Sequence, residues 1–310
     1  MKDNSLVSIV TPSYNQGEFI EHAILSIKAQ TYPHIEHIIV DAGSSDQTLD
    51  VLRQHEGTYN MRWICEPDQG MYDAINKGFR IASGEIFAYL NCDDYYLPWT
   101  VATAIQHLLE HKIIFGDAIR RDLDGYDTYL ASTPPFIHGY YLSKGIIIQP
   151  TVFFRREVFE RIGEFDATGF RLMADCDYWL RCAATGLYPH KVYEFLAVET
   201  THAATQRSKY RDQLYDELVK LRQKYPGPMR RSERLIYVLV KYFYWRLALL
   251  AYKSGWRSLW PILRHSDAVK LSWIGCILEL LPRRLRHALR PRVRIDWQKL
   301  CEGDNVRSDF

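Results

Sequence analysis

Two adjacent carboxylates, Asp93 and Asp94, follow directly after the apolar run EIFAYL. Like charges side by side repel, and burying either one alone is costly. Hard cations such as Mg²⁺ and Mn²⁺ take carboxylate oxygens as ligands and keep further positions for water and substrate phosphates, so a divalent ion would relieve the repulsion. The alternative is that one carboxylate caps a helix beginning near Pro98 while the other is solvated. The position of the pair at a strand end favours the ion.

Polar side chains also stand at the ends of the other predicted strands in this part of the chain. Ligands of open parallel α/β sheets bind outside the carboxyl ends of the strands, so these positions are candidates for binding. No GxGxxG segment follows the first strand and no GxxxxGK[ST] segment is present, which removes the main support for a dinucleotide-binding site or a P-loop. The candidates are Thr11, Ser13, Tyr14, Asn15, Asp41, Asp68 and Asn91.

Apolar runs of strand length alternate with segments of helical spacing through the first 120 residues. The strand-like runs are LVSIVTP, IEHIIVDAG, MRWICE, EIFAYL and KIIFGD. Between them, apolar residues recur every three to four positions, as in Ile20, Ile24 and Ile27, and in the segment 71–82. Strict alternation of strand and helix predicts an α/β fold with a mostly parallel sheet covered by helices on both faces.

The segments after this alternating region carry weaker patterns. Residues 118–150 read as a hairpin or loop with a turn at Asp124 and Gly125. The segment QPTVFFRREVFERIGEFD predicts a strand and a short helix, and a further helix is expected from about Ala174.

Composition indicates a globular protein with two differently charged regions. Of 310 residues, 47% are hydrophobic and 25% charged, enough to bury a core. The six cysteines lack CxxC spacing, which argues against a disulfide framework and a structural zinc site. Residues 228–310 carry 17 Lys/Arg against 7 Asp/Glu, and residues 1–227 carry 22 against 30. We therefore expect a main domain over 1–227 and a basic, aromatic-rich helical region over 228–310.

The basic C-terminal region is a candidate for membrane association. The run from Arg234 to Trp256 is strongly apolar but is interrupted by Lys241, Arg246 and Lys253, so it fits an interfacial helix better than a spanning one. Helices that pack on the main domain or form a dimer interface are the alternatives. No motif for binding nucleic acid accompanies the basic residues. The start of the chain has no apolar stretch of signal-peptide length, so we expect a cytoplasmic protein, peripheral at the inner face of the cell membrane.

Four separated segments resemble family-2 glycosyltransferases of the GT-A fold. They are VSIVTPSYNQGEFIEHAILSIKAQTYPHIEHIIVDAGSSDQTLDVL, EPDQGMYDAINKGFRIASGEIFAYLNCDDYYLPW, QPTVFFRREVFERIGEFD and MADCDYWLR. They occur in the order expected for the family and cover about residues 5–205. The resemblance implies a Rossmann-like GT-A domain that transfers sugars from nucleotide-diphosphate donors with inversion at the anomeric carbon.

The resemblance also implies roles for residues at the strand ends. Asp41 would hydrogen-bond the nucleobase, and Asp68 would face the nucleotide or the donor sugar. Asp93 would bind the metal ion, Mg²⁺ or Mn²⁺, and His202 would contact the metal or the diphosphate. Asn91 stands where the family often has an acid, so the ion would depend more on the diphosphate. The full set implied for the donor nucleotide is Thr11, Pro12, Ser13, Tyr14, Asp41, Asp68, Asn91 and Asp94.

A catalytic base is implied at Asp175 in the segment MADCDYWLR. The reaction needs a carboxylate that removes a proton from the acceptor hydroxyl as it attacks the anomeric carbon. The alternative role for Asp175 is a carboxylate stabilised by the positive end of a helix dipole. Asp177 would point elsewhere and be structural. For the acceptor, Gln149 is a hydrogen-bonding candidate and Trp179 a stacking candidate, although an aromatic beside Leu180 is as often part of a core.

These observations together predict an inverting glycosyltransferase. The donor would be a nucleotide-diphosphate sugar, most simply a UDP-sugar, and the acceptor a saccharide or lipid-linked molecule in cell-surface polysaccharide or lipopolysaccharide assembly. Two alternatives stay open: a nucleotidyltransferase, which the lack of a basic residue in TPSYNQGEF weakens, and a non-catalytic protein that binds nucleotide sugars.

Overall fold

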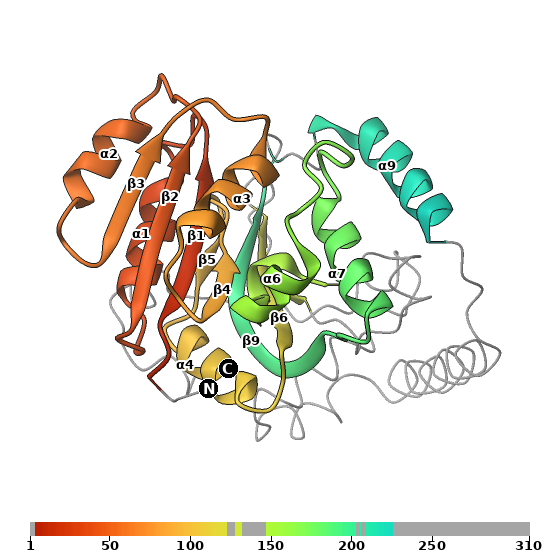
Figure 1. The fold of residues 1–310 in the computed structure, drawn as a ribbon. Coiled ribbons are helices and arrows are strands. Elements are labelled where there is room, and N and C mark those ends of the chain that lie inside the picture. The colour runs from red at the N-terminus through yellow and green to blue at the C-terminus, as the bar shows by residue number, and fades with distance from the viewer. Residues whose placement is uncertain (1–3, 123–127, 132–146, 203–204, 206–208, 226–310) are drawn as a thin grey trace, which may run out of the picture.

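A computed structural model describes residues 4–122, 128–131, 147–202, 205 and 209–225 (Figure 1). The predicted turn at 124–125 and the whole C-terminal region 228–310 lie outside these residues, as do the helices considered there for membrane attachment. Within the described residues, no helix has both the length and the apolar character needed to cross a membrane.

The described strands form one nine-stranded sheet. Its order is β3-β2-β1-β4-β8-β6-β9-β5, and β7 pairs with β6 outside this path (Figure 1). The bounds are β1 Val7–Ser13, β2 Ile35–Asp41, β3 Met61–Cys65, β4 Ile86–Tyr89, β5 Tyr95–Tyr96, β6 Ile113–Asp122, β7 Thr128–Ala131, β8 Phe153–Arg155 and β9 His190–Thr201.

Strands β1 to β4 run parallel, and so do β6 and β9. The short strand β8 joins the two parallel groups, because it is antiparallel to both β4 and β6. All six strands in these two groups therefore point the same way. The mostly parallel sheet predicted from the sequence is confirmed.

Helices cover both faces of the sheet, as the alternating pattern predicts. Residues along β4 alternate: Phe87 and Tyr89 belong to one buried cluster, Ile86 and Ala88 to another. The first cluster includes residues of α3, α6 and α7, and the second includes residues of α1 and α4. The helices are α1 Ile20–Lys28, α2 Thr48–His55, α3 Met71–Ile81, α4 Thr100–Leu108, α6 Arg156–Ile162, α7 Ala174–Ala184 and α9 Arg211–Lys224, with a short 3-10 turn at Gln149–Thr151.

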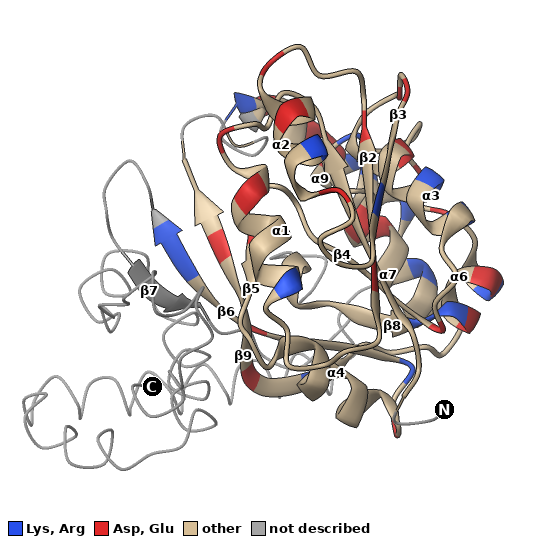
Figure 2. Ribbon diagram, turned by 90° about the vertical axis from the view of Figure 1, so that its left-hand side faces the viewer, with Lys and Arg blue, Asp and Glu red and all other residues tan. Residues whose placement is uncertain are grey.

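The half of the sheet formed by β6 and β9 differs most from the sequence-based expectation. The run KIIFGD was expected to be one short strand, whereas β6 extends to Asp122 and pairs along the twelve-residue strand β9. Basic positions on β6 lie beside an acidic position on β9 (Figure 2), where Arg120 and Glu199 form an ion pair. The two-residue strand β5 was not predicted, because two residues are too few to show a period.

Candidate functional site

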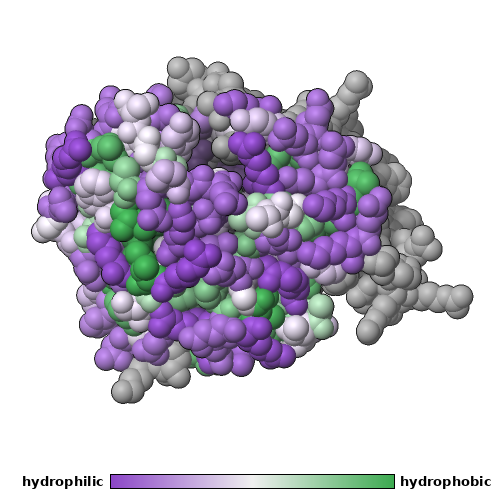
Figure 3. Space-filling model, turned by 45° about the horizontal axis from the view of Figure 1, so that its top comes forward, coloured by the Kyte–Doolittle hydropathy of each residue, from purple (hydrophilic) through white to green (hydrophobic). Residues whose placement is uncertain are grey.

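The polar strand ends predicted from the sequence lie side by side along the carboxyl-terminal edge of the sheet, where the parallel strands end. Ser13 at the end of β1 is in register with Asp41 at the end of β2, and Asp41 with Cys65 at the end of β3. Val10 in β1 is in register with Tyr89 at the end of β4. The described surface facing the top of Figure 1 is mostly hydrophilic (Figure 3). Such an edge suits a charged, hydrogen-bonding ligand.

The loops that follow β1 and β2 are joined by direct hydrogen bonds. The backbone N–H of Asn15 donates to Ser44 Oγ at 2.7 Å, and Ser45 N–H donates to the Asn15 side chain at 2.8 Å. Gly17 N–H donates to Asp46 at 3.0 Å. Asn15 has a positive φ of 52°, a conformation that asparagine tolerates better than most residues. The two loops therefore form one ordered unit at the ends of β1 and β2.

Asp41 shapes its own loop. Its carboxylate is buried and accepts hydrogen bonds from Gly43 N–H at 3.0 Å, from Ser44 N–H at 2.7 Å and from Ser44 Oγ at 2.6 Å. In this conformation the acidic group stabilises the turn after β2, so contact with a nucleobase remains a prediction for this residue.

The predicted segment from Thr11 to Tyr14 divides into buried and exposed parts. Thr11 is fully buried, and its Oγ1 lies 2.8 Å from His37 Nε2. Pro12 is buried, its carbonyl accepting from Cys92 Sγ, and Ser13 is also buried. The ring of Tyr14 is 60% exposed and is therefore open to a ligand at this edge.

His37 supports Thr11 from the neighbouring strand and gives a test by pH. It is fully buried between Thr11 and the Tyr59 hydroxyl, and burial lowers its pKa to about 3. The unfolded chain binds this proton below about pH 6.5, whereas the folded protein does not until about pH 3. Stability should therefore fall as the pH falls through this window, by about 1.4 kcal/mol per pH unit.

Urea unfolding at pH 7 and pH 5 measures this effect when the wild type is compared with His37→Gln. The wild type should lose about 2 kcal/mol more than the variant between the two pH values, since other groups titrate equally in both. Equal losses would show that His37 accepts a proton in the folded state.

Asp93 and His202 are brought together although 109 positions separate them. His202 Nε2 lies 3.3 Å from Asp93 Oδ2, and the His202 ring stacks on Phe19 with centroids 4.7 Å apart. Neighbouring ligands of an octahedral ion with bonds near 2.1 Å are about 3 Å apart, so the two atoms have a suitable spacing for one divalent ion. The nearby Asn91 Oδ1 is buried and has no hydrogen-bond partner. These donors fit Mg²⁺ or Mn²⁺.

The second carboxylate of the pair has a different environment. Asp94 is buried, and its Oδ1 accepts a hydrogen bond from Thr200 N–H in β9 at 2.9 Å. It thus ties the turn after β4 to β9, the strand that ends just before His202. Among the described residues, no three His, Cys, Asp or Glu side chains group closely enough to hold a metal ion by themselves. An ion at Asp93 and His202 would need further ligands from a bound molecule.

Asp68 lies at the start of α3. Its carboxylate accepts from Gly70 N–H at 2.8 Å, and Gly70 adopts a φ of 119° that favours glycine. Burial raises the pKa of Asp68 above its ordinary value. The residue therefore fixes the loop between β3 and α3 at the same edge of the sheet.

Asp175 is buried in the first turn of α7 and faces two tyrosines. Its Oδ1 accepts from the N–H of Cys176 at 2.7 Å. Burial raises the pKa of the Tyr72 hydroxyl, and the charge of Asp175 adds to this effect; the same two causes act on Tyr89. Because Tyr89 ends β4, Asp175 belongs to the edge of the sheet where Asp93 is found. Neither tyrosine was singled out from the sequence, since both read as core residues.

The two acceptor candidates are placed differently. Gln149 is buried and donates from Nε2 to the carbonyl of Tyr89 at 3.2 Å, while its Oε1 has no hydrogen-bond partner. Trp179 is fully buried and packs edge-on against Phe154, with centroids 5.6 Å apart. Gln149 therefore keeps a hydrogen-bonding atom for a ligand, whereas Trp179 occupies the position of a core residue.

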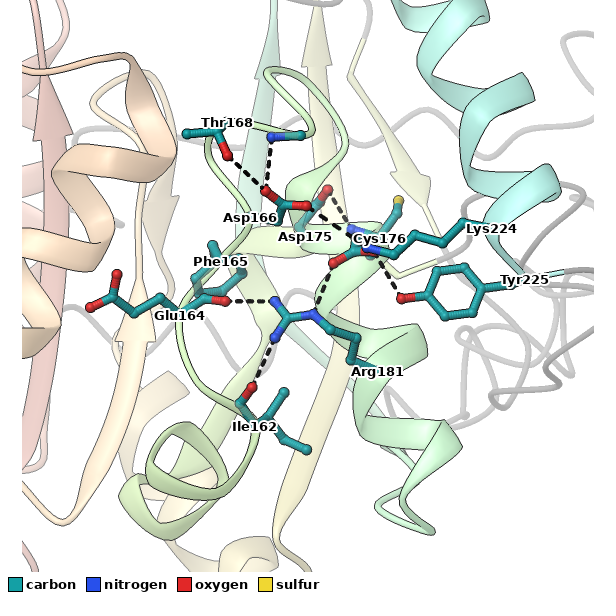
Figure 4. Close-up of polar contacts among 12 residues, drawn as sticks. Ile162, Glu164, Phe165, Asp166, Thr168, Asp175, Cys176, Arg181, Lys224 and Tyr225 are labelled. Carbon is teal, nitrogen blue, oxygen red and sulfur yellow. Dashed lines mark hydrogen bonds and ion pairs between the residues drawn. The ribbon is translucent and has the colours of Figure 1, made fainter.

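Asp177 joins α7 to the end of α9, which fits the structural role expected for it. The fully buried carboxylate accepts from Arg181 Nε at 2.9 Å, from Lys224 Nζ at 2.7 Å and from the Tyr225 hydroxyl at 2.8 Å (Figure 4). Arg181 also donates to two carbonyls at the end of α6, those of Ile162, its last residue, and Glu164, two residues later. Through these hydrogen bonds, Asp177 and Arg181 fasten α7, the helix that carries Asp175, to the ends of α6 and α9.

Comparisons with known proteins agree on one family. The model of "Glycosyl transferase family 2" matches residues 8–170. Glycosyltransferases named for PGL/p-HBAD biosynthesis in Mycobacterium bovis and Mycobacterium tuberculosis are 32% identical over 183 residues, which cover 57% of this chain and 69% of theirs.

Solved structures share the fold. S. aureus TarS 1-349, solved in complex with UDP-GlcNAc, has a TM-score of 0.56 at 16% identity, covering 90% of this chain and 82% of its own. The mannosyltransferase PcManGT from Pyrobaculum calidifontis, solved with GDP-Man and Mn²⁺, has a TM-score of 0.57 at 20% identity. The match covers 98% of this chain and 87% of PcManGT.

Proposed function

The chain belongs to glycosyl transferase family 2, and from this premise we propose that it is an inverting, metal-dependent enzyme that uses a nucleotide-diphosphate sugar. The observation that carries the proposal is the meeting of Asp93 with His202 at the strand ends, on the sheet whose strand β4 ends at Tyr89, the tyrosine that the charge of the buried Asp175 reaches. Of the described acidic residues at this edge, Asp41, Asp68 and Asp94 hold loop or strand backbone through its N–H groups. We assign the chemistry to Asp93, which meets His202, and to Asp175, whose Oδ1 accepts only from the N–H of the next residue of its own helix among the hydrogen bonds described above.

We propose a UDP-sugar as the donor. One protein of the same fold was solved with UDP-GlcNAc and another with GDP-Man, so the fold admits both nucleotides. The exposed ring of Tyr14 and the ordered loops after β1 and β2 would bind the nucleoside. Thr11 would act indirectly, because its hydroxyl faces His37.

Asp93 and His202 would hold the divalent ion, and Asn91, two positions before Asp93, has a buried side-chain oxygen without a hydrogen-bond partner. A bound Mg²⁺ or Mn²⁺ supplies Lewis-acid stabilisation of the negative charge on the departing diphosphate. With only these protein ligands, affinity for the ion should depend strongly on the nucleotide diphosphate.

Asp175 would act as the general base of the transfer. Its carboxylate takes the proton of an acceptor hydroxyl while the hydroxyl oxygen forms a bond to the anomeric carbon. The bond from that carbon to the diphosphate oxygen breaks on the opposite side, which inverts the configuration. Gln149 Oε1 would accept a hydrogen bond from the acceptor or donor sugar and help to orient it.

We further propose an acceptor that is a saccharide or a lipid-linked molecule in cell-surface polysaccharide or lipopolysaccharide assembly. The support is the sequence of residues 228–310, in which Trp, Tyr, Lys and Arg are combined as in interfacial helices. This region would bring the catalytic domain to the inner face of the membrane. The mycobacterial relatives are named for the biosynthesis of PGL/p-HBAD.

Calorimetric titration tests the donor site. UDP, GDP and dTDP are titrated with and without Mn²⁺ into the wild type, Asp93→Ala and the control Asp50→Ala, whose exposed carboxylate lies on α2. We expect one nucleotide to bind in a metal-dependent way, and Asp93→Ala to weaken that binding at least about tenfold, or 1.4 kcal/mol. No binding of any nucleotide to the wild type, or equal binding by Asp93→Ala, would refute the proposed site.

A further inference from the structure

The side chain of Glu217, on α9, binds the backbone just ahead of α7. Its two carboxylate oxygens accept hydrogen bonds from three consecutive N–H groups, those of Arg171 at 2.8 Å, Leu172 at 2.9 Å and Met173 at 2.9 Å. These N–H groups belong to the two residues before the N-cap of α7 and to the N-cap Met173 itself, and a carboxylate near a helix N-terminus is also favoured by the helix dipole. Glu217 therefore fixes, from a distant helix, the backbone that leads into α7.

The same segment is held from the opposite side by α3. The Tyr72 hydroxyl donates to the carbonyl of Leu172 at 3.4 Å, and Asn76 forms a reciprocal pair of hydrogen bonds with the backbone of Phe165, at 2.8 and 2.9 Å. Residues 165–173 thus lie between α3 and α9. Asp175 follows two residues after the segment bound by Glu217, so its position depends on how this backbone is fixed.

Helix α9 has other anchors that do not involve Glu217. Lys224 at its C-terminal end and Tyr225 just after it bind Asp177 (Figure 4). Lys220 donates to the carbonyl of Gly169 at 2.7 Å, and Leu221 is buried in the core. Removing the Glu217 carboxylate should therefore leave α9 docked. What it removes is the restraint on the backbone of residues 171–173.

We propose that Glu217 is a positioning residue for the catalytic base Asp175, an inference that rests on the function proposed above. Glu217 does not touch the reacting atoms. It fixes the backbone that leads into α7, so that the Asp175 carboxylate stays aligned with the acceptor hydroxyl. Misplacement of a catalytic group by about 1 Å can cost about 100-fold in rate, which is why one remote carboxylate can control turnover.

The test compares Glu217→Gln with Asp216→Asn, the same chemical change one residue earlier at an exposed position of α9. Glutamine keeps the size of the side chain but has one accepting oxygen where the structure uses two. Release of UDP or GDP from UDP-GlcNAc, UDP-glucose and GDP-mannose is measured with Mn²⁺, with water as the acceptor. Nucleotide affinity, melting temperature and amide hydrogen exchange at residues 171–175 are measured on the same samples.

We expect Glu217→Gln to lower kcat at least about tenfold while the KM for the donor and the affinity for its nucleotide stay within about twofold. Amide exchange should rise at 171–175, and Asp216→Asn should match the wild type. Turnover by Glu217→Gln equal to that of the wild type would overturn the inference. So would a joint loss of turnover, nucleotide binding and thermal stability, which indicates a general structural role.

A different result is expected if the proposed function is wrong. The wild type itself would then release no nucleotide from any of the three donors. That result would refute both the assignment of Asp175 as the base and the role of Glu217 in positioning it. An active wild type with an unaffected Glu217→Gln variant would reject the inference alone.

Discussion

Replacing Asp175 with asparagine is expected to reduce the kcat of sugar transfer by about 10³-fold, within the range of 10² to 10⁴ that general bases contribute. Asparagine has the same shape and can still accept the hydrogen bond that Cys176 N–H donates to Asp175. It cannot take a proton from an acceptor hydroxyl. The variant should therefore fold, bind nucleotide as the wild type does, and fail in the chemical step.

Nucleotide release from the donor that titration identifies measures this loss, with nucleotide affinity followed by calorimetry. Asp212→Asn, an exposed position in the first turn of α9, is the matched control and should keep wild-type turnover. A decrease of less than about tenfold for Asp175→Asn would assign the base to another residue. The helix-dipole alternative for Asp175 would then be sufficient, because it predicts a change in stability without a change in chemistry.

Replacing Asp177 with alanine is expected to give the largest loss of stability, about 3 kcal/mol of unfolding free energy. Asp177 is fully buried and pairs with Arg181 and Lys224, and removing one partner from a buried ion pair costs about 3–5 kcal/mol. The low end applies because both cations are partly exposed and recover some hydration. The Tyr225 hydroxyl also loses its acceptor.

Urea unfolding measures this cost, with Tyr225→Phe as a graded comparison. That variant removes a single hydrogen bond from the group and should cost about 1 kcal/mol. A loss below about 1 kcal/mol for Asp177→Ala would show that water replaces the carboxylate. In that case α9 would be held mainly by Leu221 and Glu217.

The strands and helices of the main domain could be predicted because their patterns are local. The continuous apolar run of β4 and the helical spacing of apolar residues in α1 and α3 each lie within a dozen residues. The antiparallel pairing of β6 with β7 also agrees with the hairpin alternative predicted within residues 118–150, although the predicted turn itself lies outside the described residues. The strand β5 could not be predicted, because its two residues form a strand only by pairing with β9. Tyr95 pairs with Val198 and Tyr96 with Ala197.

The candidate site could be predicted in part. Residue type and position at a strand end were enough to single out Asp93, whereas Asp175, at the start of a helix, was singled out by the family resemblance. The resemblance gave the metal ion to Asp93 and a nucleotide contact to Asp94, but residue type alone could not show that Asp94 accepts a hydrogen bond from the backbone N–H of Thr200 in β9. Nor could it show that Gln149 keeps an oxygen without a hydrogen-bond partner while the ring of Trp179 is buried in the core.

The sequence by itself determined the fold class and the chemical types at the strand ends, because hydrophobic period and residue type act over short distances along the chain. Only the tertiary structure decided which of those side chains face one another. His202 contacts Asp93, which is 109 positions away in the sequence, and Glu217 accepts a hydrogen bond from Leu172, which is 45 positions away. These contacts depend on how whole elements pack, and no local pattern records the orientation of a distant helix. Packing thus decides that Asp93 meets His202 and that Asp94 binds the backbone of β9.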